Sequence, residues 1–247
     1  VYCTGSQLAT EMNLVNGLHF AGDPSRRAKR TRKTRVLILG VNGFIGNFLS
    51  ERLLAAGNFE VHGMDLNDSA IRRLESHPDF HFVEGDMQIH HEWLEYHIKK
   101  CDVIVPLVAI ATPIEYTRNP LRVFELDFEE NLRVVRYCVK YGKRVIFPST
   151  SEVYGDPQIH PQHESYYGHV NPIGPRGVYD EAKRFAEAMT MAYQRSHGVE
   201  TRIVRIFNTY GPFSDPLDGR LVPNFIIQAI NKENLTVYGD GSQTRSL

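Results

Sequence analysis

The chain has 247 residues, of which 42% are apolar and 23% are charged, an ordinary composition for a globular protein with a large core. Its net charge of −1 gives no general attraction to nucleic acid or anionic membranes. No apolar run is long enough to span a bilayer and no secretory signal opens the chain, so we expect a cytoplasmic protein. Cys3, Cys101 and Cys138 are odd in number and far apart, which predicts free thiols in a reducing compartment.

Residues 1 to about 33 show no strong periodicity and end in a basic run at 26–33. Such a run could contact nucleic acid. A single short cluster ahead of a folded domain is, however, more typical of a solvated linker. We therefore assign residues 1–33 to a linker or to the tail of a preceding domain.

From Thr34 onward, apolar strand patterns alternate with helical patterns. Strands are expected at 35–40, 60–66, 81–85, 103–109, 144–149 and 200–207, with a short last strand at 235–238. Helices are expected at 44–56, 88–99, 120–141, 177–197 and 222–231. This alternation predicts a Rossmann-like α/β fold, in which helices cover both faces of a doubly wound parallel sheet.

Three glycines mark the turn after the first strand. Gly40, Gly43 and Gly46 follow an apolar run and open a helical pattern, which is the arrangement that binds a dinucleotide pyrophosphate at a helix N-terminus. Asp65 ends the next strand, where its carboxylate can accept hydrogen bonds from both ribose hydroxyls. A 2′-phosphate would meet like charge there, so the pattern favours NAD over NADP. Asp86 closes the third strand and is a candidate adenine contact, with a turn or cap role as the alternative. Phe44 and Ile45 complete the candidate cofactor-binding residues.

Tyr179 and Lys183 are spaced to lie one turn apart on the same face of a helix. The ammonium can then stabilise a phenolate and lower the pKa of the phenol towards neutrality, while Lys183 also contributes to the cofactor site. Thr150, at the end of a strand, can hold a substrate alcohol beside this base. Alternation along the strand would put Thr150 and Glu152 on one face. This combination predicts removal of a proton and a hydride from a secondary alcohol.

The eleven histidines raise the question of a metal site, especially at His90, His91, His160 and His163. No cysteine or carboxylate completes a ligand set with them at a recognised spacing. We expect these side chains to be solvated or to cap helices, and we predict no metal.

The chain resembles the extended short-chain dehydrogenase/reductases, and most closely the UDP-glucuronate decarboxylases. Residues up to about 155 resemble the bifunctional polymyxin-resistance formyltransferase/decarboxylase, and residues from about 156 resemble UDP-xylose synthase. The first resemblance rests on VNGFIG at 41–46, PLVAIATP at 106–113 and PSTSEVYG at 148–155. The second rests on NPIGPR at 171–176, RIFNTYGP at 205–212 and YGDGSQTR at 238–245.

The resemblance implies an enzyme that binds NAD and UDP-glucuronate and works as a homo-oligomer, with no nucleic-acid or membrane partner. Tyr179, Lys183 and Thr150 would oxidise C4 of the sugar, and Ser151, Glu152 and Arg245 would assist the loss of carbon dioxide. The product would be a UDP-4-keto-pentose or, after re-reduction, UDP-xylose. The implied substrate-binding residues are Ala111, Tyr116, Asn208, Val222, Asn224, Tyr238 and Arg245.

We expect an NAD-binding domain at 34–208 with the catalytic helix, and a partial sugar-nucleotide domain at 209–247 that ends earlier than in the family. Three other interpretations remain open. A 4-epimerase or 4,6-dehydratase would share the Tyr179, Lys183 and NAD core without needing Glu152. A catalytically inert NAD-binding fragment would not need that core, and a nucleic-acid-binding protein would depend on 26–33 alone.

Overall fold

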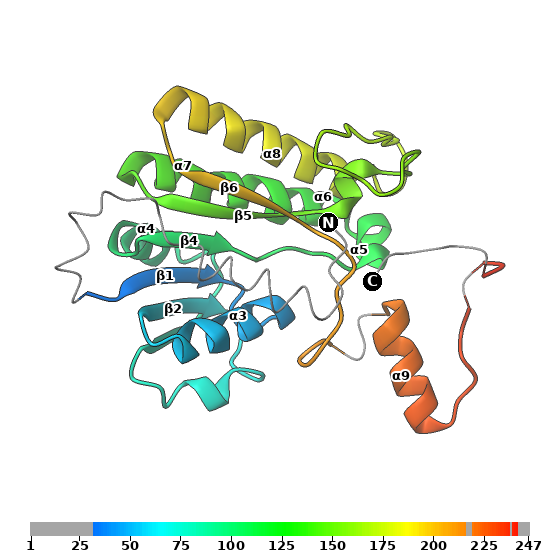
Figure 1. Cartoon of the computed structure of the whole chain (residues 1–247), viewed down its shortest axis with the longest axis horizontal. Coiled ribbons are helices and arrows are strands. Elements are labelled where there is room, and N and C mark those ends of the chain that lie inside the picture. The colour runs from blue at the N-terminus through cyan, green and yellow to red at the C-terminus, as the bar shows by residue number, and fades with distance from the viewer. Residues whose placement is uncertain (1–31, 216–218, 238, 242–247) are drawn as a thin grey trace.

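The computed structural model describes residues 32–215, 219–237 and 239–241, and its centre is a six-stranded parallel sheet (Figure 1). The strands lie in the order β3-β2-β1-β4-β5-β6, the order of a dinucleotide-binding fold whose switch point lies between β1 and β4. They are β1 (Thr34–Leu39), β2 (Phe59–Asp65), β3 (Phe80–Glu84), β4 (Val103–Pro106), β5 (Arg144–Thr150) and β6 (Thr201–Ile206). The predicted Rossmann-like fold is confirmed.

Helices connect successive strands, as parallel pairing requires. The α-helices are α3 (Phe44–Ala55), α4 (His91–Lys100), α5 (Pro113–Arg118), α6 (Pro120–Phe124), α7 (Asn131–Tyr141), α8 (Gly177–His197) and α9 (Leu221–Asn231). Shorter elements are the 3₁₀ helices η2 (Arg72–Leu74) and η4 (Ser151–Tyr154) and the π-helical segment η3 (Glu125–Glu130). None of the helices in the described part of the chain has the length and hydropathy needed to cross a bilayer.

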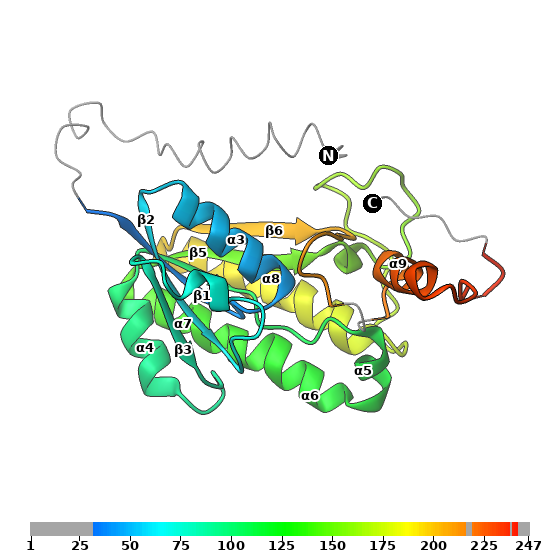
Figure 2. The same ribbon diagram turned by 90° about the horizontal axis from the view of Figure 1, so that it is seen from below.

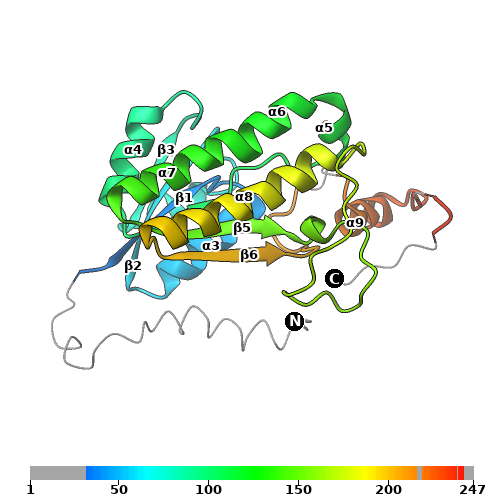
Figure 3. The ribbon, with the colours of Figure 1, turned by 90° about the horizontal axis from the view of Figure 1, so that it is seen from above.

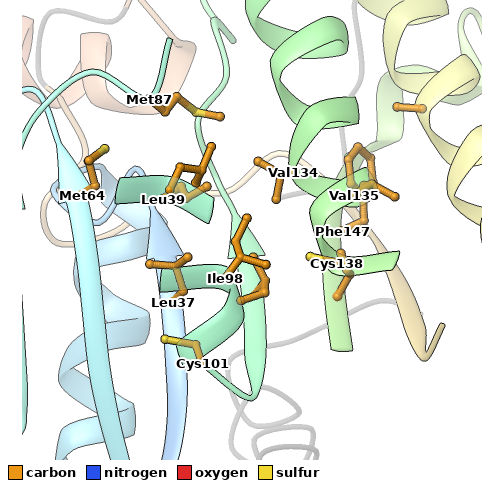
Figure 4. Packing of buried hydrophobic residues seen from close by; sticks show 14 of the residues in the cluster. Leu37, Leu39, Met64, Met87, Ile98, Cys101, Val134, Val135, Cys138 and Phe147 are labelled. Carbon is orange, nitrogen blue, oxygen red and sulfur yellow. The ribbon is translucent and has the colours of Figure 1, made fainter. Parts of the chain in front are cut away.

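Alternate residues of the central strands contribute to two cores on opposite faces of the sheet. Leu37 and Leu39 of β1 pack with residues of α4, α7 and α8, whereas Val36 and Ile38 pack with residues of α3. Figures 2 and 3 show these helices around the sheet, and Figure 4 shows the first core around Ile98 and the other labelled side chains. Each buried aliphatic side chain stabilises the fold by about 1.5–3 kcal/mol relative to exposure, so both layers hold the sheet in place.

Three details differ from the sequence predictions. The helix expected at 120–141 is divided by η3, and the side-chain amide of Asn131 donates to the carbonyl of Leu126 within that segment at 3.1 Å. A further helix, α5, precedes it and was not predicted. Residues 235–237 form no strand, since no partner strand lies beside them in the described part of the chain.

The boundary between the two family resemblances, near residue 155, is crossed by many contacts. The hydroxyl of Tyr154 accepts a hydrogen bond from Arg205 at 2.9 Å, and Ser149 donates to Glu187 at 2.5 Å. Gly155 and His169 form a β-bridge across it. The segments before and after residue 155 therefore pack as one unit. Cys101 and Cys138 are buried free thiols as expected, and Cys3 lies outside the described residues.

Candidate active site

The carboxyl edge of the sheet gathers most of the predicted site residues, because each follows or ends a parallel strand. The glycine turn follows β1, Asp65 ends β2, and Asp86 follows β3. The loop with Ala111 follows β4, Thr150 ends β5, and Asn208 follows β6. Arg245 and Tyr238 lie outside the described residues.

The glycines of the turn after β1 are required for different reasons. Gly40 has φ +82°, a left-handed conformation that favours glycine. A Cβ on Gly46 would lie 2.3 Å from the carbonyl oxygen of Gly40, so this glycine permits close packing of α3 against the turn. Gly43 has an ordinary φ of −66°, and a Cβ there would lie 3.4 Å from its nearest neighbour, which is normal contact. Nothing within the described protein demands glycine at position 43.

The N-terminus of α3 and the side chain of Asp65 lie beside the glycine turn and complete the candidate cofactor site. No side chain caps α3 at Gly43, so the first backbone N–H groups of the helix are available to an anion. Asp65 accepts hydrogen bonds from the backbone N–H groups of Asn42 and Leu66, both at 2.8 Å. Burial raises the pKa of Asp65, and these backbone donors oppose the rise. The N–H of Gly43 is a third backbone donor to this carboxylate, which leaves one lone-pair site for a ribose hydroxyl.

Asp86 makes a turn contact, and the adenine contact remains a prediction. Its carboxylate accepts a hydrogen bond from the backbone N–H of Gln88 at 2.9 Å. The ring of His90, which precedes α4, lies 2.9 Å from the carbonyl oxygen of Asp86. His90 is the residue before α4, but its side chain makes no hydrogen bond to that helix, so the expected capping role is wrong.

Tyr179 and Lys183 project from α8 into the buried end of the site. Their exposed fractions are 6% and 3%, and the Lys183 ammonium lies 5.8 Å from the centre of the Tyr179 ring. Tyr116 of α5 stacks on Tyr179 with the ring centres 4.6 Å apart. The side chain of Thr150, at the end of β5, hydrogen-bonds to the Tyr179 hydroxyl.

The predicted lowering of the Tyr179 pKa is not found in this structure of the protein alone. Burial raises the pKa of Tyr179, the negative charge of Asp127 raises it further, and the hydrogen bond with Thr150 only partly opposes this. Burial likewise lowers the pKa of Lys183, because a charged ammonium loses its water. The helical spacing correctly predicted that Tyr179 and Lys183 lie together, but the prediction of a lowered phenol pKa is wrong.

Asp127, which the sequence analysis missed, is the charged neighbour of this pair. It lies in η3 with no exposed surface, and its Oδ1 accepts a hydrogen bond from the backbone N–H of Ile110 at 2.7 Å. Its Oδ2 is buried without a hydrogen-bond partner among the described residues. Burial raises the pKa of Asp127 to about 6, and the charge of Lys183 lowers it. Asp127 in turn raises the pKa of Lys183, so each charge stabilises the other.

Ser151 and Glu152 follow Thr150 in the 3₁₀ helix η4 rather than in the strand. The backbone N–H of Glu152 donates to the Thr150 hydroxyl oxygen at 3.2 Å, which caps this turn. The prediction that residues 150 and 152 share a strand face is therefore wrong. Glu152 is half-buried and forms an ion pair with Arg176, the residue before α8. Its charge nevertheless reaches Tyr179, whose pKa it raises.

The remaining predicted sugar contacts are less closely grouped. Asn208 is exposed beyond β6, while Val222 and Asn224 are half-buried on α9, a helix with no fully buried residue. Arg220, directly before α9, is near enough for its charge to lower the pKa of Tyr179. A hollow of about 330 Å³ lies beside α5 and α8 and has Tyr116 in its wall, but neither Thr150 nor Lys183 lines it.

Comparison with known proteins identifies the class to which this arrangement belongs. Residues 36–247 match the model of the NAD dependent epimerase/dehydratase family, and the chain belongs to this family. The cofactor of the family is NAD, as the sequence predicted.

Solved structures agree with this assignment. The PbgP3 protein from Burkholderia pseudomallei is 44% identical over 85% of this chain, with a TM-score of 0.80. This chain spans 65% of the length of that protein. A UDP-glucuronic acid 4-epimerase from Bacillus cereus, in complex with UDP-glucuronic acid and NAD, is 25% identical with a TM-score of 0.76, over 86% of this chain and 68% of its own. A dTDP-glucose 4,6-dehydratase from Bacillus anthracis in complex with NAD is 26% identical with a TM-score of 0.72, over 84% and 65%.

Proposed function

We propose that the chain carries the catalytic core of an NAD-dependent UDP-glucuronate decarboxylase, which oxidises C4 of the sugar and then releases carbon dioxide. The observation that carries this proposal is the position of Glu152, whose charge acts on the Tyr179 hydroxyl while Arg176 fixes its carboxylate. Proton abstraction at C4 needs Tyr179, but it does not need a second acid beside it. A decarboxylation has a use for that acid, because a proton must return to C5.

The cofactor fits the turn after β1. Gly43 and the first N–H groups of α3 would hold the pyrophosphate, and Asp65 would accept hydrogen bonds from the adenosine ribose. Phe44 and Ile45 open the same helix, and Lys183 would contact the nicotinamide ribose. Bound NAD⁺ supplies the hydride acceptor and a positive charge at the reacting end of the site.

The side chains of the core divide the proton chemistry. Tyr179 would take the proton of the C4 hydroxyl, and Thr150 would hold that hydroxyl in position. Lys183 would stabilise the phenolate, and Asp127 would keep Lys183 charged although it is buried. Tyr116, stacked on Tyr179, would keep the phenol ring facing the sugar.

Oxidation at C4 makes loss of the carboxylate easy, because the C5 carboxylate is then β to a carbonyl. The electrons of the breaking bond flow into the ketone, giving an enolate that must be protonated at C5. Glu152, with Ser151 beside it, would manage this proton or the departing carboxylate. The product is UDP-4-keto-pentose or, if the hydride returns to C4, UDP-xylose.

The sugar nucleotide would lie between the carboxyl edge and α9. Asn208, Val222 and Asn224 would contact its UDP, together with Ala111 and Tyr116 on the sugar side. Tyr238 and Arg245 are further candidates from the family resemblance. We also infer that the enzyme works as a homo-oligomer.

A 4-epimerase is the second candidate. The B. cereus structure holds UDP-glucuronic acid with NAD in a related fold, so this substrate can also be epimerised without losing its carboxylate. Both reactions would use Tyr179, Lys183 and Thr150 in the same way. They differ in the fate of the carboxylate.

The deciding experiment follows that carboxylate. The protein is incubated with NAD and UDP-glucuronate labelled at the carboxyl carbon, and released carbon dioxide is counted while mass spectrometry and NMR identify the sugar nucleotide. A UDP-pentose with equimolar labelled carbon dioxide supports the decarboxylase. UDP-galacturonate with full retention of label would establish the epimerase instead. NADH formation with neither product would limit the chain to the oxidation step.

A further inference from the structure

Two neighbouring strands, β2 and β3, bring a carboxylate and two imidazoles together outside the glycine turn. Glu60 and His62 alternate along β2 and so lie on one face of the sheet. His62 pairs in register with His81 of β3, which places His81 on that face as well. The site lies towards the start of β2, whereas Asp65 at the other end of the strand belongs to the proposed cofactor site.

The three side chains converge on one point. Oε1 of Glu60 lies 2.8 Å from Nε2 of His62 and 3.5 Å from Nε2 of His81. One ligand atom from each of the three residues lies within 4.8 Å of the others. Small rotations of the two imidazoles about an inserted ion would bring all three atoms to coordinating distance, since bonds from zinc to nitrogen and oxygen are about 2.0–2.2 Å.

Without an ion, Nε2 of His62 and Oε1 of Glu60 are hydrogen-bonded to each other, and the surroundings turn both towards His81. Oε2 of Glu60 faces Arg35 at 3.4 Å, so Oε1 is the oxygen turned to the imidazoles. His97 closes the inner side with its ring centre 5.6 Å from that of His62, and its Nδ1 lies 3.0 Å from the Trp93 carbonyl oxygen. The side chain of His81 is 49% exposed, which leaves an entry from solvent and room for a water ligand.

The charges around the three side chains act in both directions, and Glu60 supplies the one carboxylate of the set. Arg35 and Lys100 are the nearby positive charges, and they would weaken the attraction for a cation.

We propose that Glu60, His62 and His81 bind a divalent transition-metal ion such as Zn²⁺ through Oε1 and the two Nε2 atoms. Two imidazoles and one carboxylate match the preference of zinc, and they are a poor set for Ca²⁺ or Mg²⁺, which prefer oxygen ligands alone. Such an ion would fasten the edge strand β3 to β2. The same contacts without a metal would be a hydrogen-bonded stack, with the two imidazole ring centres 4.7 Å apart.

Metal titration of the purified chain separates these two outcomes without any assay of activity. After treatment with EDTA, the protein is titrated with Zn²⁺ by calorimetry and with Co²⁺ by visible absorption, which reports tetrahedral coordination. His81→Gln removes the exposed ligand and keeps a polar side chain of similar length. His197→Gln, an exposed substitution at the end of α8, is the matched control for histidine sites elsewhere on the chain.

We expect a Zn²⁺ site in the wild type and in His197→Gln that weakens at least about tenfold in His81→Gln, since loss of even an outer-sphere partner often costs that much. Equal affinity in wild type and His81→Gln, or no binding in the wild type, would overturn the proposal. Glu60→Gln repeats the test if His81→Gln fails to fold. It keeps the size of the side chain but removes the charge that the cation needs.

Discussion

The carboxyl edge of the sheet and helix α9 differ in how firmly the described chain holds them. Tyr179 and Lys183 are almost fully buried, and both oxygens of Asp65 accept backbone hydrogen bonds. Helix α9 has no buried residue, and Leu221, Ile226 and Ile230 are 50–69% exposed. The proposed chemistry is therefore organised by the fold itself. The proposed UDP contacts lie on α9, a helix that the described core holds less firmly.

The largest effect is expected for a substitution of Tyr179, which lies in the most buried part of the site. Tyr179→Phe keeps the stack on Tyr116 but removes the hydroxyl that Thr150 contacts. We expect NAD reduction with UDP-glucuronate to fall by about 10²–10⁴, the usual cost of losing a positioned general base. Absorbance at the NADH band measures this rate.

NAD affinity and the melting temperature serve as controls for Tyr179→Phe, and both should stay near the wild-type values. Unchanged turnover in a correctly folded Tyr179→Phe would remove the proposed role of this residue. A fall in turnover together with a loss of NAD binding would mean that the substitution disturbs the candidate cofactor site instead.

Asp127→Asn tests the buried charge that faces Lys183. The folded-state pKa of Asp127 is about 6, above its unfolded value near 4, so its stabilising effect is complete below pH 4 and is lost as pH rises through 6. The amide that replaces the carboxyl group in the variant does not titrate. The unfolding free energy of the wild type minus that of the variant should therefore decrease by about 2–3 kcal/mol between pH 4 and 7.

Urea unfolding at several pH values measures this difference for Asp127→Asn, and the carboxylates common to both proteins cancel. Asp180, whose burial also raises its pKa to about 6, is among the groups that cancel. A difference that stays constant with pH would show that Asp127 does not titrate in this range. The activity of the variant should fall more as pH rises, because Lys183 loses the neighbouring charge that raises its pKa.

Glu152 is half-buried at the end of the sheet, and its substitution tests the fate of the carboxylate. Glu152→Gln keeps the size of the side chain but loses the charge that pairs with Arg176. We expect carbon dioxide release to slow by about ten- to a hundredfold, as for a charge-assisted hydrogen bond worth about 1.5–3 kcal/mol. The binding of NAD and UDP should change far less. Wild-type release of label from Glu152→Gln would leave Glu152 as a structural partner of Arg176.

Asp65→Asn tests the proposed contact with the adenosine ribose of NAD at the carboxyl edge of the sheet. The amide keeps one acceptor oxygen and turns a donor NH₂ towards the backbone N–H of either Asn42 or Leu66, both of which the carboxylate accepts from. We expect NAD to bind about tenfold more weakly, with relatively better tolerance of NADP, because a charge-assisted hydrogen bond is lost. Fluorescence titration with both cofactors measures this. Equal NAD affinity in wild type and Asp65→Asn would contradict the ribose assignment.

Local patterns in the sequence predicted the parts of the molecule that local rules determine. Apolar runs predicted the strands β1 and β2, and the tight turn between β1 and α3 explains why Gly40 and Gly46 are glycines. Asp127 could not be found in this way, because its burial depends on the π-helical segment η3 inside what reads as one long helix. The pairing of His62 with His81 depends on the register between two strands, which no spacing along the chain reveals.

The smallest expected effect belongs to α9 and completes the comparison. Asn224 is half-buried on a helix that buries no residue, so Asn224→Ala should change the free energy of unfolding by less than about 0.5 kcal/mol, as surface substitutions do. NAD affinity should also stay the same, since the proposed cofactor contacts lie at the ends of β1 and β2 and not on α9. UDP affinity, measured by calorimetry, should be the one quantity that falls if this helix contacts the nucleotide. A loss of stability in Asn224→Ala would instead mean that α9 is packed in solution, and the contrast between the two regions would then disappear.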